Sequence, residues 1–156
     1  MNAPFEAKVE TAFLFLGIIV LLVVDKEKGT INRVALSKTE LAENTTTVSV
    51  KEFKNIKIPV DYQDNIIAKA IKTGEPQETT DWKDLFAPDL SAKEARLNQA
   101  SGGIAYSAVH PLLGVYDGAA LIFSYYQYRH EIGEPQHTFM KKYSEVVAKA
   151  LAKSKN

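Results

Sequence analysis

The sequence predicts an α+β protein in which strands joined by tight turns are combined with amphipathic helices. Three observations lead to this class. An unbroken apolar run occupies residues 13–24, polar turns with glycine separate strand-like segments, and several later segments show helical periodicity.

The apolar run, FLFLGIIVLLVV, contains one glycine and no polar side chain. As a helix it would be only ~18 Å long, whereas a membrane span must cross ~30 Å of hydrocarbon. A secretory signal is also disfavoured, because Glu6 and Glu10 precede the run and charged residues follow it at 25–28. Such a run is typical of a strand buried on both faces, expected from about Ile18 to Val24. The segment from Ala3 to Leu16 could instead be the end of a helix that leads into this strand.

Length and composition restrict the possible functions. A chain of 156 residues suits a single domain, here 1–156. Nineteen basic residues balance nineteen acidic ones, so no broad field favours nucleic acid or a membrane as partner. The absence of cysteine excludes disulfides, thiolate metal sites, cysteine nucleophiles and cofactors attached through sulfur. Since no secretory signal is recognised, we expect a cytoplasmic protein.

Strand signals flank the first polar turn. After the turn at 25–29, the segment from Thr30 to Ser37 mixes apolar and polar positions and completes a hairpin. Residues 38–47 are polar, and we expect a surface loop or an irregular helix end there. The segment NIKIPV at 55–60 is typical of an edge strand, because its proline cannot donate a hydrogen bond to a neighbouring strand.

Further strands are expected in the second half of the chain. The segment EPQETTDW at 75–82 predicts a brief extended stretch, and a turn is expected at 84–88. Two strands follow, from Ile104 to Leu113 and from Ala119 to Tyr128. The pair Asp117-Gly118 between them is a strong hairpin signal.

Three helices are expected from their end signals. Asp64 stands at the N-cap position of the first, and Gly74 ends it. Ser91 and Glu94 form a capping box that begins a second helix, from Ala92 to about Ala100. The last helix begins near Pro135 and carries an apolar stripe. The stripe consists of Phe139, Tyr143, Val146, Val147, Ala150 and Leu151.

Sequence patterns for catalysis are missing. Neither a phosphate-binding glycine loop nor a serine-hydrolase elbow occurs. The histidines His110, His130 and His137 lack the three- or four-residue spacing that brings two imidazoles onto one metal ion. Asp81 and Asp84 are interpreted as solvated carboxylates of a polar turn rather than as a catalytic pair. We therefore expect no enzyme and no metal site.

Four residues are candidates for binding a ligand: Trp82, Tyr106, His110 and Tyr126. Strand alternation places Tyr106 and His110 on one face, where phenol and imidazole groups can fix a small polar molecule. The alternative for His110 is a hydrogen-bonded structural histidine. Trp82 could stack on a ligand or pack in the core or a lid. Tyr126 shares a face with Ser124, although an error of one residue in register would exchange the two faces.

The sequence contains the long segments NIIAKAIKTGEPQETTDW, GGIAYSAVHPLLGVYDGAALIFSYY and FMKKYSEVVAKAL. Together they resemble the GAF family of small-molecule sensory domains. In that family, a helix ending in "TGEP" leads into a short strand near an aspartate, a later strand carries Ser-x-x-x-Pro-Leu, and a glycine hairpin follows. Here the corresponding residues are 73–76, Asp81, 107–112 and 117–118, and the turn at 26–29 resembles that of the family's first strand pair.

The resemblance covers nearly the whole chain and implies a definite architecture. It predicts a central antiparallel β-sheet of about five or six strands flanked by helices, with a cavity between the sheet and the connecting segments. A PAS or profilin-like sheet is the nearest alternative fold. Family members are regulatory inputs of signalling proteins that bind cyclic nucleotides, tetrapyrroles or small metabolites. They often pair through their terminal helices.

Departures from the family pattern narrow these expectations. Without cysteine, a covalently attached bilin and methionine sulfoxide reductase activity are both disfavoured. The Asn-Lys, Phe and Asp-Glu motif associated with cyclic nucleotides is not evident. We therefore expect a non-catalytic regulatory domain, standing alone or as an excised input part of a bacterial signalling protein. It would bind a small molecule of unknown identity and form a homodimer through its terminal helices. The alternative is a dimerisation or docking module with no ligand.

Overall fold

The computed structural model describes residues 1–6, 14–115 and 117–154. Within these residues the chain forms a six-stranded antiparallel sheet with strand order β3-β2-β1-β6-β5-β4, which confirms the predicted α+β class. The strands are β1 (Leu16–Asp25), β2 (Thr30–Leu36), β3 (Lys57–Pro59), β4 (Gln77–Thr79), β5 (Tyr106–Pro111) and β6 (Ala119–Tyr125). The helices are α1 (Ala3–Glu6), α2 (Glu40–Val48), α3 (Ile66–Thr73), α4 (Lys83–Phe86), α5 (Ala92–Ser101) and α6 (Glu134–Ser154), with single 3₁₀ turns η2 (Phe53–Asn55) and η3 (Arg129–Glu131).

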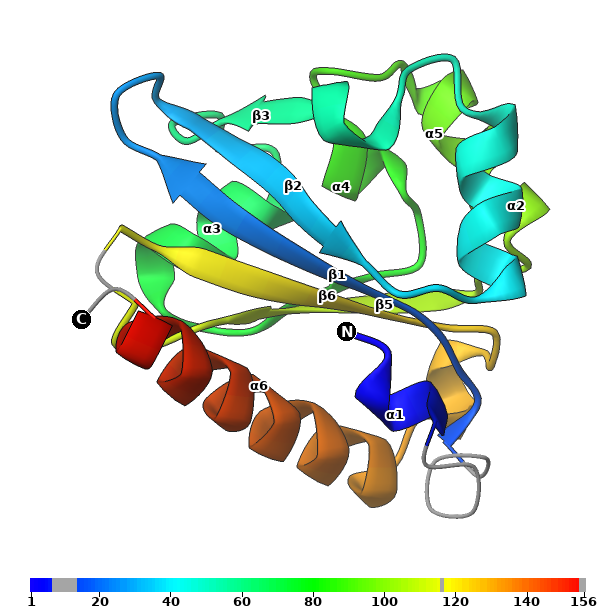
Figure 1. Cartoon of the computed structure of the whole chain (residues 1–156). Coiled ribbons are helices and arrows are strands. Elements are labelled where there is room, and N and C mark those ends of the chain that lie inside the picture. The colour runs from blue at the N-terminus through cyan, green and yellow to red at the C-terminus, as the bar shows by residue number, and fades with distance from the viewer. Residues whose placement is uncertain (7–13, 116, 155–156) are drawn as a thin grey trace.

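Helices cover both faces of the sheet. Figure 1 shows α6 running along one face, together with α1, while α2, α4 and α5 lie on the opposite side. Helix α3 packs on that opposite side too, since Ile67 and Ala70 join the same apolar cluster as α4 and α5. We call the two sides the α6 face and the α2–α5 face. Each has its own apolar core.

Strand β1 lies in the middle of the sheet and supplies both cores. Ile19 and Leu22 are fully buried, the first on the α6 face and the second on the α2–α5 face. Burial on both sides explains why the apolar run contains no polar side chain. The predicted strand is confirmed with longer bounds. Of the alternative helix at 3–16, residues 3–6 are helical, Leu16 is in the strand, and residues 7–13 lie outside the described part.

A β-bulge in β2 changes which side chains reach the α2–α5 face. Leu21 pairs with Ala35, and the next residue, Leu22, pairs with Arg33. The extra residue between these partners, Val34, is 54% exposed. An extra residue reverses the alternation of side chains beyond it. As a result Arg33 and Leu36, three positions apart, both line the same cavity on the α2–α5 face.

Two expected irregular segments are helical. Residues 38–47 contain most of α2, which begins after Thr39, whose side chain accepts a hydrogen bond from the Ala42 amide. Only Ala42 and Thr45 of this helix are buried, so few of its positions need to be apolar. The sequence therefore shows no clear helical periodicity there. The expected turn at 84–88 overlaps the single helical turn α4.

Helix α6 uses a slightly different stripe from the predicted one. Met140 and Ala148 are buried against the sheet together with Val147, whereas Val146 is 62% exposed. Phe139 packs against this core. Most apolar side chains of α6 face the sheet. Dimerisation through the terminal helices stays a prediction. No helix in the described ranges has the length and apolar character needed to cross a membrane.

The N-cap of α3 is Asn65 rather than the predicted Asp64. The buried Asn65 Oδ1 accepts hydrogen bonds from the Ile67 amide (2.8 Å) and the Ala68 amide (3.4 Å). Its Nδ2 donates to the Ala87 carbonyl at 2.8 Å, which ties α3 to the loop after α4. Asp64 is exposed. The two adjacent residues have similar cap propensity, so the sequence alone does not choose between them.

Replacing Asn65 tests this double role. We expect Asn65→Ala to lower the free energy of unfolding by about 2 kcal/mol, because both the helix cap and a buried hydrogen bond are lost. Asp64→Ala is the matched control and should change it by less than about 0.5 kcal/mol. Urea unfolding followed by circular dichroism measures both. Equal losses for the two variants would contradict the assignment.

Candidate functional site

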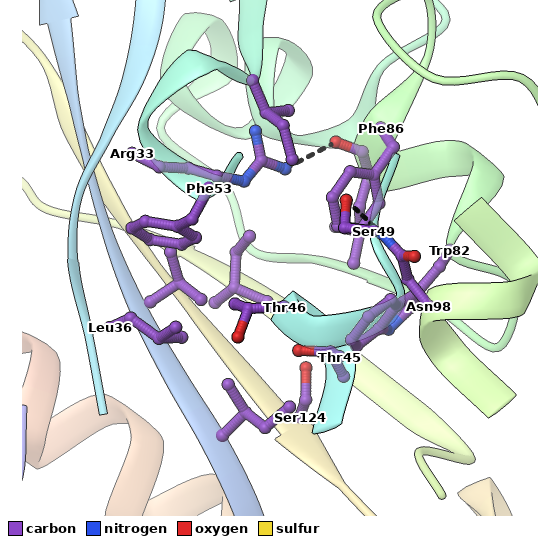
Figure 2. A pocket seen from close by; sticks show the side chains of 15 residues that line it. Arg33, Leu36, Thr45, Thr46, Ser49, Phe53, Trp82, Phe86, Asn98 and Ser124 are labelled. Atoms are coloured by element: carbon purple, nitrogen blue, oxygen red, sulfur yellow. Dashed lines mark hydrogen bonds between the residues drawn. The ribbon is translucent and has the colours of Figure 1, made fainter. Parts of the chain in front are cut away.

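A small cavity lies between the centre of the sheet and the segments that cover the α2–α5 face (Figure 2). Side chains of β1 and β6, including Ile18, Val20 and Ile122, give it an apolar wall. Arg33 from β2 and Asn98 from α5 bring polar atoms to it. Its volume is about 40 Å³, enough for about three or four water-sized groups. We call it the Arg33 cavity.

Arg33 is the most unusual residue of this cavity, because a guanidinium carries a full positive charge and only 4% of this residue is exposed. Its Nη2 donates a hydrogen bond to the Leu85 carbonyl at 3.3 Å, and its Cζ lies 4.5 Å from the centre of the Phe86 ring. Figure 2 shows the side chain extending from β2 toward Phe86. The buried Nη1 has no hydrogen-bond partner among the described residues.

No carboxylate neutralises Arg33 by a direct ion pair within the described part of the chain. The nearby Asp89 is engaged elsewhere: its Oδ1 lies 2.6 Å from Lys51 Nζ, and its Oδ2 accepts from the Lys57 amide at 3.1 Å. Burial lowers the pKa of Arg33 to about 10, against a smaller raising effect of Asp89. Arg33 therefore stays charged at neutral pH, with one donor nitrogen unused.

Trp82 and two serines form a hydrogen-bonded chain beside the cavity. The Trp82 indole donates to Ser107 Oγ at 2.9 Å, and Ser107 Oγ lies 2.7 Å from Ser124 Oγ. All three side chains are buried. The Trp82 ring also packs against Phe86 at 5.4 Å between centroids. Trp82 therefore packs in the core and at the same time lines the cavity.

A second, open groove lies on the α6 face, beside the edge strand β4. Its volume is about 580 Å³, and Tyr106 and His110 both line it. The Tyr106 hydroxyl donates to Glu78 Oε2 at 2.9 Å, and Glu78 also pairs with Arg129. Burial raises the pKa of Glu78, but the hydrogen bonds from Arg129 and Tyr106 outweigh it and hold that pKa below its usual value. We call this the Tyr106 groove.

His110 stands against the core of the α6 face. Its ring meets Phe123 edge-on at 5.5 Å between centroids. Burial, with a smaller contribution from His137 across the groove, lowers the pKa of His110 to about 4. The imidazole is therefore neutral at physiological pH, and no hydrogen bond is recorded for it within the described residues.

The structure separates the four predicted ligand residues. Tyr106 and His110 share the groove on the α6 face, as strand alternation predicts. Trp82 lies on the other face, at the Arg33 cavity. Tyr126 follows the end of β6, is 46% exposed and packs edge-on against Phe15. It lines neither site, and whether any of the four binds a ligand stays a prediction.

Sequence reasoning missed Arg33, although a signal was present. Ile31 and Arg33 are two positions apart in a predicted strand and therefore lie on the same face. Because Ile31 marks this face as apolar, an arginine is unexpected there. Strand alternation alone assigns no role to Ser124, which lines the cavity in the structure. The aspartates act structurally: Asp81 pairs with Arg96 at 2.7 Å, and Asp84 accepts from the Thr79 hydroxyl at 2.6 Å. The described residues include no group of three side chains that could hold a metal ion.

The environment of His110 predicts a pH dependence of stability. The folded state takes up this proton only near pH 4, whereas the unfolded chain takes it up near its ordinary pKa of 6.5. The contribution of the neutral His110 to the free energy of unfolding is therefore complete above pH 6.5 and is lost as the pH falls toward 4. We expect His110→Gln to reduce the fall in the free energy of unfolding across this window. Urea unfolding at a series of pH values measures it.

His130→Gln, at an exposed position, is the matched control and should retain the pH dependence of the unchanged protein. If His110→Gln leaves the same slope as this control, His110 does not titrate as its burial implies. Chemical shifts of the ring protons followed with pH give an independent value of its pKa.

Comparison with known proteins identifies the fold. No family model matches the sequence, and no curated protein matches it significantly. Solved structures do match. The GAF domain of a two-component sensor histidine kinase from Bacillus halodurans is 12% identical, with a TM-score of 0.63 over 98% of this chain and 94% of that one. The GAF domain of a phosphoenolpyruvate-protein phosphotransferase from Coxiella burnetii is 12% identical, with a TM-score of 0.61 over 99% and 84%.

The second GAF domain of DevS from Mycobacterium smegmatis is 17% identical, with a TM-score of 0.58 over 97% of this chain and 89% of that one. At these identities the likeness concerns the fold. It extends over nearly the whole length of each chain, which agrees with the motifs in the sequence. The chain therefore has the fold of the GAF domains.

Proposed function

We propose that this chain is a regulatory input domain that binds a small molecule in the Arg33 cavity without changing it chemically. The observation that carries this proposal is the buried guanidinium with an unused donor at the wall of a cavity. A buried charge that lacks an ionic partner destabilises a folded protein. Such strain is typical of a site where a ligand supplies the missing partner.

The surroundings of the cavity support the same function. Trp82 and Ser124 join the cavity to the sheet through a hydrogen-bonded chain, so a ligand there would contact groups held by rigid elements. GAF domains are usually non-catalytic modules of larger sensors and enzymes, and the motifs of this sequence contain no nucleophile or paired acid. The Tyr106 groove is the alternative binding place, and the experiment below separates the two.

The cost of the unpaired charge can be measured without a ligand. Arg33→Met removes the charge and retains a side chain of similar reach. We expect the free energy of unfolding of ligand-free protein to rise by about 1 kcal/mol, because relief of the desolvation cost exceeds loss of the Leu85 hydrogen bond. Arg129→Met, at an exposed ion pair, is the control and should leave the free energy of unfolding almost unchanged. If Arg33→Met instead lowers the free energy of unfolding by more than about 1 kcal/mol, the role of Arg33 is purely structural.

Ligand binding is tested by two linked readouts. Trp82 is the only tryptophan and lines the cavity, so its fluorescence reports occupancy directly. A bound metabolite should raise the melting temperature and change this fluorescence together. Native mass spectrometry of freshly purified protein should show an extra mass that disappears on denaturation. A compound that stabilises the protein without changing the fluorescence, and whose effect is lost in Tyr106→Phe, would place the site in the groove. If no compound stabilises the protein and no extra mass is seen, the proposal is wrong.

A further inference from the structure

The Arg33 cavity has features that restrict the class of its ligand. This inference rests on the proposed function, that a small molecule binds there. The first feature is charge. The Arg33 Nη1 is buried without a partner, and the neighbouring carboxylate, Asp89, is already paired with Lys51. A guanidinium with a free N–H group in such a place matches a planar anion, which can accept a charge-assisted hydrogen bond from Nη1.

The second feature is the shortage of other free donors. Asn98 Nδ2 donates to Ser49 Oγ at 3.1 Å, and the Thr45 hydroxyl donates to the Ala42 carbonyl at 2.8 Å. Ser124 Oγ and Ser107 Oγ share one hydrogen bond, in which either oxygen could be the donor. A phosphate or sulfate has more acceptor oxygens and charge than one guanidinium can satisfy, and a buried acceptor without a partner is costly. The site therefore favours a monoanion with few polar atoms.

The third feature is the size and polarity of the remaining space. A volume of about 40 Å³ admits about three or four non-hydrogen atoms, counted as water-sized groups. Part of the cavity wall is aliphatic and is formed by Ile18, Val20 and Ile122. A methyl group is favourable against such a wall, whereas a second polar end would be left without hydrogen bonds.

We infer that the Arg33 cavity binds a short aliphatic monocarboxylate of the size of acetate, with its carboxylate on the Arg33 guanidinium and its methyl group against the β1 and β6 side chains. The anion supplies the acceptor that Nη1 lacks. It also places a negative charge in direct contact with Arg33, whereas Asp89 is paired with Lys51. Binding would therefore relieve the cost of burying Arg33 at the same time as it fills the cavity.

Three probes with the same number of non-hydrogen atoms test the separate features. Acetate carries charge and a methyl group, acetamide removes the charge, and nitrate keeps a planar anion without the methyl group. Titrations at constant ionic strength are followed by ¹H–¹⁵N NMR of the full chain, using the indole signal of Trp82 and the amides of Ser49 and Leu85. We expect saturable shifts with acetate, and at least tenfold weaker binding of acetamide and of nitrate.

Two variants connect the binding to Arg33. Arg33→Gln should weaken acetate binding about tenfold to a hundredfold, as expected when a charged hydrogen bond is lost. Arg33→Lys should restore part of it, because the charge returns without the planar fork. Arg129→Gln, on the other face of the sheet, should leave the affinity unchanged. Dispersed NMR spectra and cooperative thermal unfolding show that each variant is folded. The titration with acetamide tests the role of the ligand's charge in the unchanged protein.

The outcomes separate this inference from the proposed function. If acetamide binds as tightly as acetate, or if Arg33→Gln binds acetate unchanged, the carboxylate assignment is overturned while ligand binding in the cavity stands. If nitrate binds as tightly as acetate, the aliphatic part is overturned. If acetate shifts no cavity signal but another metabolite shifts the Trp82 signal and raises the melting temperature, this inference alone fails. If no compound does either, the proposed function fails with it.

Discussion

The pairing of β1 with β6 at the middle of the sheet is the constraint on which the other elements depend. Both strands are buried on both faces, so neither can exist without helices packed above and below. Their register sends alternate residues to opposite cores: Ile122 and Ser124 to the α2–α5 face, Phe123 and Tyr125 to the α6 face. The cavity and the groove are therefore two separate sites on one sheet.

The two sites illustrate two ways of burying an ionisable group. His110 can lose its proton, and its low pKa means that burial is accommodated by becoming neutral. Arginine has no such route at neutral pH, because even a strongly lowered pKa leaves it charged. A buried histidine in an apolar core needs no further explanation, whereas a buried arginine with an unused nitrogen does. Arg33 is therefore a stronger indication of a binding site than His110.

Much of the fold was predictable because its signals are local. Turn residues, the Ser91 capping box and the uninterrupted apolar run each act over a few neighbouring positions, and the structure contains the elements they indicate. The candidate site was less predictable. Trp82 and Tyr106 are both aromatic residues near strand-like segments, but only the tertiary arrangement shows that they occupy opposite faces. The bulge at Val34, which brings Leu36 to the same side as Arg33, leaves no recognisable sequence signal.

In strand β5, Tyr106 lines the groove, and the next residue, Ser107, is hydrogen-bonded to two residues that line the cavity, Trp82 and Ser124. The Tyr106 side chain is anchored by Glu78 on the α6 face, and the next side chain, Ser107, is anchored by Trp82 on the opposite face. Only one peptide unit separates these anchors, and a peptide unit is planar and stiff. A rotation or shift of this unit therefore moves both anchors together. The cavity and the surface on which α6 lies are therefore separated only by the backbone of one strand. A relay of side chains across the molecule is not needed to connect them.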